Sequence, residues 1–452
     1  MKRIHFIAIG GSAMHNLALA LSEKGYLVTG SDDEIYDPAR TRLQLQGLLP
    51  EEMGWHPSRI THEIDTIILG MHARPDNPEL AKATQLGINI CSYPEYVYKQ
   101  SRDKKRVVIG GSHGKTTTTA MILHVLDKLG VDADYLVGAQ LPGFRNMVRL
   151  TDASIIIIEG DEYLSSPIHR EPKFWYYRPH VAVLTGVAWD HINVFPTFEN
   201  YEQQFSEFVN RIEKDGTLFW YKNDPSLQKI LQTHQNNVKT SAYDTPEYNY
   251  TEKGLSIIHK LKTYPVGIFG IHNLQNLEAA RLVCQKLGVT TPEFYNAISD
   301  FTGAAKRLET KGENGHSTVF LDFAHAPSKV EATVKAVKHR NPDRKLIAIF
   351  ELHTFSSLNK EFLTQYANTL DPAETPIVYF SSHTLEMKKM PALSKTFVQN
   401  AFDNKNLTVY TEKAKLHNYL FNLNLQNTNL LLMSSGNFSK LDLPMLCQTI
   451  LD

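Results

Sequence analysis

The stretch VVIGGSHGKTTTTAMIL, residues 107–123, constrains the fold more than any other part of the chain. A short apolar run ends in two glycines, which predicts a buried strand followed by a loop. The run after Lys115 has the length and pattern of a helix. A buried strand that passes through a glycine loop into a helix is typical of parallel sheets covered by helices. We therefore expect an α/β protein.

The loop in this stretch has the chemistry of a phosphate site. Backbone N–H groups at a helix N-terminus attract phosphate oxygens, the Lys115 ammonium neutralises charge, and the Thr116 hydroxyl is suited to reach Mg²⁺. The standard loop reads G-x-x-x-x-G-K-[ST], and Ile109 stands where its first glycine belongs. The alternative is a chance glycine–lysine–threonine, which the position between strand and helix disfavours.

Carboxylates follow the next predicted strand. SIIIIEG (154–160) ends at Glu159, with Asp161 and Glu162 directly after it, and Asp190-His191 follow the strand HVAVLTG (180–186). The carboxyl ends of parallel strands meet at one edge of a sheet, and carboxylate oxygens suit Mg²⁺. A solvated acidic loop and a structural histidine are the alternatives.

The chain begins with a second glycine turn. RIHFIAI (3–9) predicts a strand, and Ser12 to Lys24 a helix. The dinucleotide pattern G-x-G-x-x-G is incomplete here, because alanine occupies positions 8 and 13. Asp32 follows the second strand, about where a ribose-binding acid belongs. The turn is either a tight connection or a diphosphate site for NAD or a sugar nucleotide.

Composition excludes several classes of protein. With 47 basic and 48 acidic residues the net charge is −1, so no nucleic acid or anionic membrane is expected as a partner. No apolar run approaches the roughly 20 residues of a membrane helix. Three distant cysteines form neither a disulfide framework nor a metal motif, which favours a cytoplasmic location.

The length of 452 residues indicates more than one domain. The basic stretch SRDKKR (101–106) resembles a hinge, and a third series of alternating strands and helices begins after Arg307. We predict domains at 1–104, 105–305 and 306–452. The expected fold is a Rossmann-like N-terminal domain, a central ATPase-type parallel sheet with a phosphate loop, and a Rossmann-like C-terminal domain.

Several motifs, taken in order, resemble those of the Mur ligases, the ATP-dependent amide-forming enzymes of peptidoglycan synthesis. The family loop is the shorter G-x-x-G-K-T-[ST], which Gly111 to Thr117 match, so Ile109 simply ends the strand. Further similar motifs are GIHNLQNLEAA (270–280), FTGAAKRLE (301–309), LDFAHAP (321–327) and SSGNF (434–438). The resemblance runs through nearly the whole chain.

The resemblance implies a UDP-sugar on the first domain, ATP with Mg²⁺ on the second and the incoming amine on the third. The implied ATP contacts are Gly111, Ser112, His113, Gly114, Lys115, Thr116, Thr117, His272, Asn273, Asn276 and Arg307. The implied UDP-sugar contacts are Gly10, Gly11, Ser12, Ala13, Met14, Ser31, Asp32 and Glu162. The implied metal ligands are Thr116, Glu159 and His191, and the implied catalytic residues are Lys115, His191, Arg307, Asp322 and His325.

IGGSAM and GSD (30–32) resemble the members of the family that act on UDP-N-acetylmuramate itself. Of these, one kind adds L-alanine in biosynthesis. The other adds the recycled tripeptide L-alanyl-γ-D-glutamyl-meso-diaminopimelate. Nine residues separate DEY (161–163) from KFWYYRP (173–179), a spacing similar to that of the tripeptide-adding members, whereas ELHTF (351–355) shares features with both. We expect the tripeptide, with L-alanine as the alternative.

The expected reaction is phosphoryl transfer from ATP to the muramoyl carboxylate, followed by attack of the amine with release of phosphate and ADP. We expect a monomer or weak homodimer. Three departures from the family pattern concern the metal and nucleotide sites: Gly186 replaces an asparagine, Ala326 replaces a histidine, and NYEQQFSEF (200–208) has no lysine. An NAD-dependent oxidoreductase and a phosphate-loop switch protein are remote alternatives.

Overall fold

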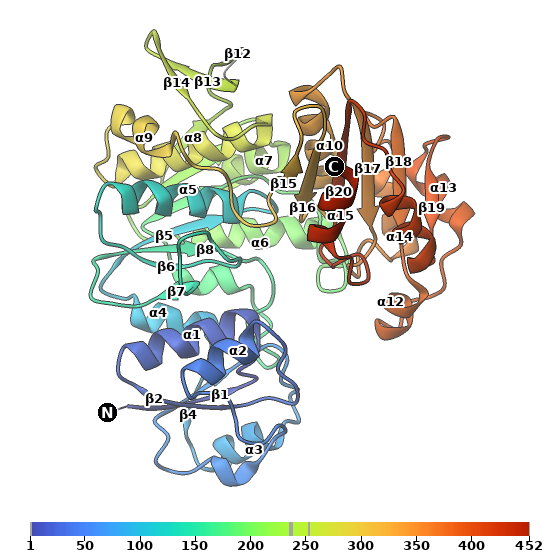
Figure 1. The fold of residues 1–452 in the computed structure, drawn as a ribbon. Coiled ribbons are helices and arrows are strands. Elements are labelled where there is room, and N and C mark those ends of the chain that lie inside the picture. Colours follow the sequence, from blue (N-terminus) through green and yellow to red (C-terminus); the bar gives the residue numbers. More distant parts are fainter. Residues whose placement is uncertain (1, 235–237, 252–253, 452) are drawn as a thin grey trace. The chain divides into compact units, whose positions relative to one another are not determined.

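The computed structural model describes residues 2–234, 238–251 and 254–451 (Figure 1). The chain forms two compact units. The first comprises residues 1–187, 202–244 and 278–298, and the second comprises residues 188–201, 245–277 and 299–452. The boundaries that we drew at 104 and 305 remain a prediction.

The first sheet is parallel, with the strand order β2-β1-β3-β4. Its strands are β1 (Arg3–Ile7), β2 (Leu27–Ser31), β3 (Thr66–Leu69) and β4 (Asn89–Ser92). Its helices are α1 (Ser12–Glu23), α2 (Ala39–Leu45), α3 (Pro78–Gln85) and α4 (Tyr93–Gln100), with the 3₁₀ turn η1 (Pro57–Arg59). Figure 1 shows α1 and α2 on one side of the sheet and α3 on the other.

The second sheet, also in the first unit, has the order β11-β10-β9-β5-β8-β6-β7, and only β7 runs antiparallel. Its strands are β5 (Lys105–Gly110), β6 (Asp134–Leu136), β7 (Val148–Arg149), β8 (Ile155–Glu159), β9 (Val181–Leu184), β10 (Thr217–Tyr221) and β11 (Lys239–Tyr243). The helices in this part of the sequence are α5 (Lys115–Lys128), η2 (Lys173–Tyr177), α6 (Phe198–Asn210), α7 (Pro225–Thr233), α8 (Ile271–Lys286) and α9 (Thr291–Ile298). The central strands β5, β8 and β9 are almost wholly buried, which explains their β-branched sequences.

The second unit contains a six-stranded sheet of order β15-β16-β20-β17-β18-β19, in which β15 alone is antiparallel. Its strands are β15 (Glu309–Glu313), β16 (Thr318–Asp322), β17 (Lys345–Glu351), β18 (Thr375–Tyr379), β19 (Thr408–Tyr410) and β20 (Thr428–Met433). Its helices are α10 (Pro327–Arg340), α11 (Lys360–Leu363), η3 (Thr364–Tyr366), α12 (Ser382–Met387), α13 (Lys395–Phe402), α14 (Lys413–Phe421) and α15 (Leu443–Leu451). Two hydrophobic cores cover its two faces, one around Phe350 and the other around Ile349.

A small antiparallel sheet is formed by β12 (Tyr248–Thr251), β13 (Gly254–His259) and β14 (Lys262–Pro265). Residues 235–237 and 252–253 lie outside the described residues. The α/β class with mainly parallel sheets is confirmed. Within the described part of the chain, no helix is both long and apolar enough to cross a membrane.

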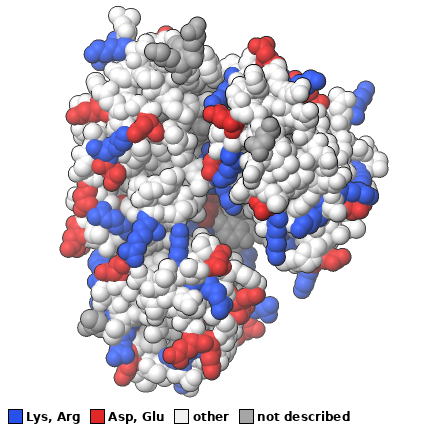
Figure 2. All heavy atoms as spheres, in the orientation of Figure 1, with Lys and Arg blue, Asp and Glu red and all other residues white. Residues whose placement is uncertain are grey.

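The surface and the cysteines agree with the composition. Basic and acidic side chains are interspersed over the face in Figure 2, without a large region of one sign. Cys91, Cys284 and Cys447 are all buried and free of disulfides. Burial raises the pKa of the Cys284 thiol.

Candidate functional site

The phosphate loop joins β5 to α5, as the sequence predicts, and its backbone requires glycine. Gly111 has φ +131° and Gly114 has φ +80°, a region that other residues rarely adopt. A Cβ on Gly111 would lie 2.0 Å from Thr185 Oγ1, just after β9. The Ser112 N–H donates to the Gly186 carbonyl (2.9 Å), so the loop is bonded to the end of the neighbouring strand.

Lys115 is held by the acidic turn after β8. Its ammonium lies 2.7 Å from Glu162 Oε2 and 2.5 Å from the Gly111 carbonyl, and the two side chains are 14% and 1% exposed. Burial by itself would lower the Lys115 pKa, but the carboxylates of Glu162, Asp161 and Glu159 outweigh it, so the pKa lies above its ordinary value. The resemblance implied that Glu162 contacts the sugar, and no local pattern in the sequence predicted its ion pair with Lys115.

Thr116 and Glu159, predicted as metal ligands, do lie together. The Thr116 hydroxyl donates to Glu159 Oε1 (2.7 Å), and the Gly138 N–H donates to Glu159 Oε2 (2.8 Å). Their hard oxygens beside a phosphate loop suit Mg²⁺, which usually takes one or two carboxylates plus phosphate oxygens and water. Among the described residues, no group of three or more His, Cys, Asp or Glu side chains is arranged so that it could hold a metal ion.

The N-terminal turn brings Gly10 and Asp32 together. The Gly10 N–H donates to Asp32 Oδ2 (2.7 Å), and a Cβ on Gly10 would lie 2.9 Å from the same oxygen. Burial, reinforced by Asp33, raises the pKa of Asp32 to about 6 despite this bond. Gly11 is the N-cap of α1, and Ser12, Ala13 and Met14 form its first turn.

Ser31 belongs to a buried network that the sequence did not reveal. Its hydroxyl donates to Glu79 Oε1 (2.7 Å), and the other Glu79 oxygen lies 3.5 Å from His5 Nε2. The Arg59 guanidinium donates to the Ser31 hydroxyl (3.0 Å). These contacts link β1, β2, α3 and η1, which are far apart in the sequence, and no local pattern predicts them.

In the second unit, Asp322 shapes the turn at the end of β16. Its two oxygens accept the N–H groups of Leu308 (2.5 Å) and Ala324 (2.6 Å). Burial raises the Asp322 pKa, and the nearby Arg307 guanidinium opposes that rise. The guanidinium carbon of Arg307 lies 4.7 Å from the centre of the Phe323 ring.

His325 faces Asp190. Its Nε2 lies 3.3 Å from Asp190 Oδ2, its Nδ1 lies 2.9 Å from the Phe323 carbonyl, and Lys329 Nζ is 3.8 Å from the same Asp190 oxygen. Burial acts to raise the Asp190 pKa, but the surrounding His191, His325 and Lys329 hold it well below its ordinary value. The position of Lys329 beside Asp190 was not predicted from the sequence.

Four more predicted residues, His191, His272, Asn273 and Asn276, also lie in the second unit, whereas His113 and Thr117 belong to the first. His191 adopts φ +56°, and its N–H donates to Asp190 Oδ1 (2.7 Å). At the start of α8, burial lowers the pKa of His272 to about 4, which keeps the ring neutral. Asn273 Nδ2 donates to the Phe269 carbonyl (3.0 Å), and Asn276 Nδ2 lies 3.4 Å from Asn273 Oδ1.

Comparison with known proteins accounts for most of the chain. Three family models match: the Mur ligase family, catalytic domain, at residues 3–105; the Mur ligase middle domain, at 109–284; and the Mur ligase, glutamate ligase domain, at 306–436. The UDP-N-acetylmuramate–L-alanine ligase of Caldanaerobacter subterraneus subsp. tengcongensis is 32% identical over 83% of this chain and 82% of that protein. The chain belongs to the Mur ligase family.

Solved structures of Mur ligases share its fold. The UDP-N-acetylmuramate–alanine ligase of Thermotoga maritima superimposes with a TM-score of 0.72 at 19% identity, covering 97% of each chain. The UDP-N-acetylmuramate:L-alanyl-γ-D-glutamyl-meso-diaminopimelate ligase of Neisseria meningitides gives a TM-score of 0.61 at 25% identity, covering 67% of this chain and 98% of that one. As a Mur ligase the protein is an ATP-dependent, ADP-forming enzyme, which confirms the predicted class of activity.

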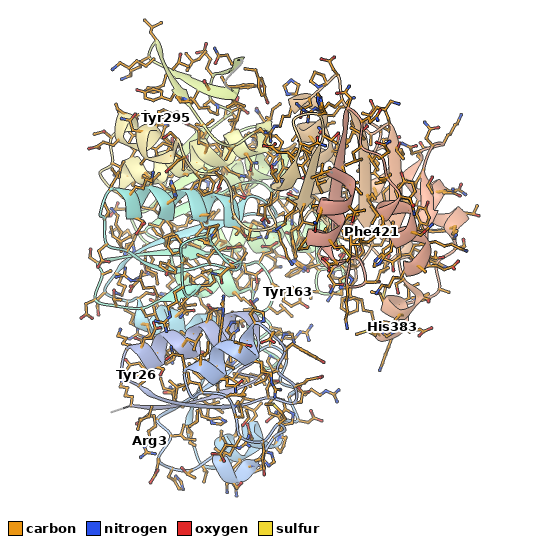
Figure 3. All side chains as sticks on the ribbon, viewed as in Figure 1. Arg3, Tyr26, Tyr163, Tyr295, His383 and Phe421 are labelled. Atoms are coloured by element: carbon orange, nitrogen blue, oxygen red, sulfur yellow. The ribbon has the colours of Figure 1, made fainter. Side chains whose placement is uncertain are left out.

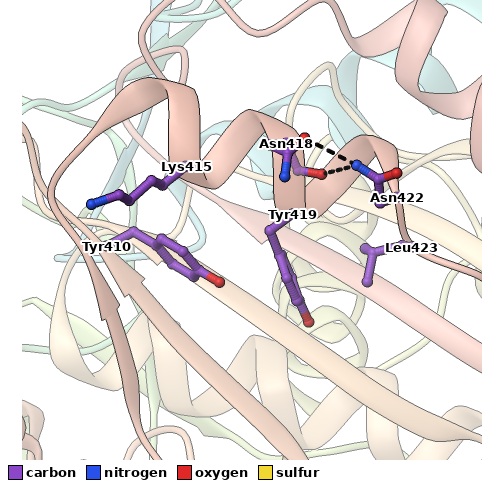
Figure 4. A pocket seen from close by; sticks show the side chains of 6 residues that line it. All are labelled: Tyr410, Lys415, Asn418, Tyr419, Asn422 and Leu423. Atoms are coloured by element: carbon purple, nitrogen blue, oxygen red, sulfur yellow. Dashed lines mark hydrogen bonds between the residues drawn. The ribbon is translucent and has the colours of Figure 1, made fainter.

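This Mur ligase also has a shallow pocket of about 450 Å³ beside α14 (Figure 4). Its lining consists of Tyr410, Lys415, Asn418, Tyr419, Asn422 and Leu423. Two of these, Asn422 and Asn418, are already bonded to each other, with Asn422 Nδ2 donating to Asn418 Oδ1 (3.2 Å) and to its carbonyl (2.7 Å). None of the predicted site residues lines this pocket, so we give it no part in the reaction.

Proposed function

We propose that this Mur ligase joins the carboxylate of UDP-N-acetylmuramate to the α-amino group of an L-alanyl residue, with ATP as the energy source. The single observation that carries the proposal is the cluster at the carboxyl edge of the second sheet. There the Lys115 ammonium, the Thr116 hydroxyl and the Glu159 carboxylate stand at the phosphate loop. This set of groups is suited to a nucleoside triphosphate and its metal ion.

The chemical problem is that a carboxylate has no good leaving group. Phosphoryl transfer from ATP would convert it to an acyl phosphate, and attack of the amine would then release phosphate. Negative charge accumulates in both steps, so Lys115 would act by electrostatic stabilisation. A bound Mg²⁺ would neutralise phosphate charge, and Thr116 and Glu159 would hold it. Asp190 would hold His325 through the contact of 3.3 Å.

Two amines fit the proposal, and both present the amino group of L-alanine. Free L-alanine has the stronger support, because the curated relatives that match over most of the chain are named UDP-N-acetylmuramate–L-alanine ligases. The tripeptide, our first expectation, is supported by the nine-residue connection 164–172 and by the Neisseria structure. The N-terminal turn with Gly10 and Asp32 would take the UDP-sugar in either case.

The test is release of ADP from ATP in the presence of UDP-N-acetylmuramate, with L-alanine and the tripeptide supplied in separate reactions. We expect release to depend on both the UDP-sugar and one amine, and the amine with the higher kcat/KM is the substrate. A reaction without amine measures background hydrolysis of ATP. Failure of both amines to raise ADP release above that background would overturn the proposal.

A further inference from the structure

One buried carboxylate lies outside the groups proposed for the reaction. Glu79, in the first turn of α3, is 0% exposed. Its Oε1 accepts two hydrogen bonds, one from the Ser31 hydroxyl (2.7 Å) and one from the His56 N–H (2.7 Å). Its Oε2 lies 3.5 Å from His5 Nε2 and makes no hydrogen bond within the described part of the chain. Burying a carboxylate is costly, and the two charge-assisted bonds at Oε1 offset part of that cost.

The first of these bonds fixes the end of β2, which lies beside β1 in the first sheet. Figure 3 labels Arg3 at the start of β1 and Tyr26 just before β2. Ser31, the last residue of β2, accepts the N–H groups of Ala8 (2.9 Å) and Ile9 (3.1 Å) at its carbonyl. Its hydroxyl is the group that the buried carboxylate holds. The carboxylate is therefore connected, through one residue, to the turn that follows β1.

The turn after β1 has a backbone that needs such support. Ala8 adopts φ +69°, which is unfavourable for any residue except glycine. The Gly10 N–H donates to Asp32 Oδ2 (2.7 Å), so the N–H groups of residues 8, 9 and 10 are all bonded to Ser31 or Asp32. The unpaired N–H groups at the N-terminus of α1 follow directly, and their direction depends on this turn.

The second bond, from the His56 N–H, fixes the loop that leads into η1. In the same loop, the Gly54 N–H donates to the Asp32 carbonyl (2.7 Å). Arg59, at the end of η1, donates to the Ser31 hydroxyl (3.0 Å). A single carboxylate oxygen therefore joins two segments that are both bonded to Asp32.

We infer that Glu79 is a positioning residue for the UDP-sugar, because it fixes Ser31 and the loop at His56 and so sets the turn at Gly10 and the place of Asp32. The inference rests on the proposed function and adds to it a residue to which the resemblance gave no role. The charge of the carboxylate contributes, since a hydrogen bond to an ionised acceptor is about twice as strong as one to a neutral acceptor.

The experiment measures kcat and the KM values for UDP-N-acetylmuramate and ATP by ADP release, with the amine that the wild type uses. Glu79→Ala should raise KM for UDP-N-acetylmuramate roughly tenfold, the worth of the lost hydrogen bonds, while kcat and KM for ATP change less than about twofold. Glu79→Gln keeps an acceptor oxygen but loses the charge, so it should raise the same KM only about threefold. Ala81→Gly weakens the same helix at an exposed position and should leave all three values unchanged.

A double variant tests the connection through Ser31. Because Glu79→Ala and Ser31→Ala remove the same bond, the two together should raise KM for UDP-N-acetylmuramate little more than the larger single effect. Fully additive effects would overturn the inference.

Three further outcomes would also overturn it: an unchanged KM for UDP-N-acetylmuramate in the Glu79 variants, an equal rise in KM for ATP, or the same rise in Ala81→Gly. If Glu79→Ala does not fold, the smaller effect of Glu79→Gln decides. Absence of ADP release that depends on both UDP-N-acetylmuramate and an amine in the wild type would instead overturn the proposed function, and the role of Glu79 with it.

Discussion

Lys115 and Glu162 form a buried ion pair at the phosphate loop. Replacing Lys115 should therefore affect both catalysis and the stability of the fold. Lys115→Met should lower turnover at least about a hundredfold, because one preorganised cation is lost from the transition state. It should also lower the free energy of unfolding by about 3–5 kcal/mol, because the buried Glu162 carboxylate loses its ion pair with Lys115. ADP release and urea unfolding measure the two effects.

The double variant Lys115→Met with Glu162→Gln separates these effects. It removes the buried charge, so most of the stability should return while turnover stays low. Recovery of turnover together with stability would show that Lys115 acts only through folding, and that Lys115 is not part of the chemistry.

Asp32 makes stability depend on pH in a definite direction. Its pKa in the folded protein is about 6, above the ordinary value of 3.8, so the folded state binds this proton more tightly than the unfolded state. The folded protein therefore loses stability as pH rises from about 4 to 6, by about 1–2 kcal/mol after allowance for solvent screening. Asp32→Asn should remove this part of the pH dependence, measured by urea unfolding across that range. An identical slope in the variant would contradict the assignment.

The contacts that could not be predicted from the sequence are those between residues far apart along the chain. Lys115 and Thr116 were predicted because the glycine loop and the flanking strand and helix are local patterns. The pairing of Lys115 with Glu162 spans 47 positions, and Asp190 meets His325 only through the packing of the second unit.

At the scale of elements, the strands of the three main sheets were largely predictable because their buried β-branched runs contrast with the surrounding polar loops. Several strands were not predicted, among them β10 (TLFWY) and the edge strand β15 (ETKGE). The first is short and aromatic, and the second is polar because it lies at the sheet edge. Tertiary pairing, not local pattern, makes both of them strands.

Two glycine variants test the phosphate loop: Gly111 lies in the loop, and Gly130, which follows α5, serves as the control. Gly111 and Gly130 both have positive φ, so alanine strains the backbone at either position. Only at Gly111 does the new Cβ also meet Thr185, at 2.0 Å, whereas nothing lies within 4 Å at Gly130. Gly111→Ala should abolish ATP binding measured by calorimetry, and Gly130→Ala should cost about 1 kcal/mol of stability with binding intact. Equal ATP binding in both would show that the loop is not the nucleotide site.

For the whole molecule, the proposed reaction needs groups from both compact units. Lys115 and Thr116 belong to the first unit, whereas Arg307 and His325, to which the resemblance assigns catalytic roles, belong to the second. Reacting atoms must come within about 3.5 Å of each other. We expect ATP analogue and UDP-N-acetylmuramate together to reduce the radius of gyration in solution scattering. An unchanged radius with both ligands bound would count against closure.

The three buried cysteines have a practical consequence for that question. Cys91, Cys284 and Cys447 are all shielded from solvent, so thiol reagents should reach them slowly in the folded protein. A cysteine introduced at Leu261, a fully exposed position in the turn between β13 and β14, should react far faster. Fluorophores or spin labels can therefore be attached to introduced cysteines in the native chain with little background. Distances between two such labels in one molecule then follow the catalytic cycle without prior removal of the natural thiols.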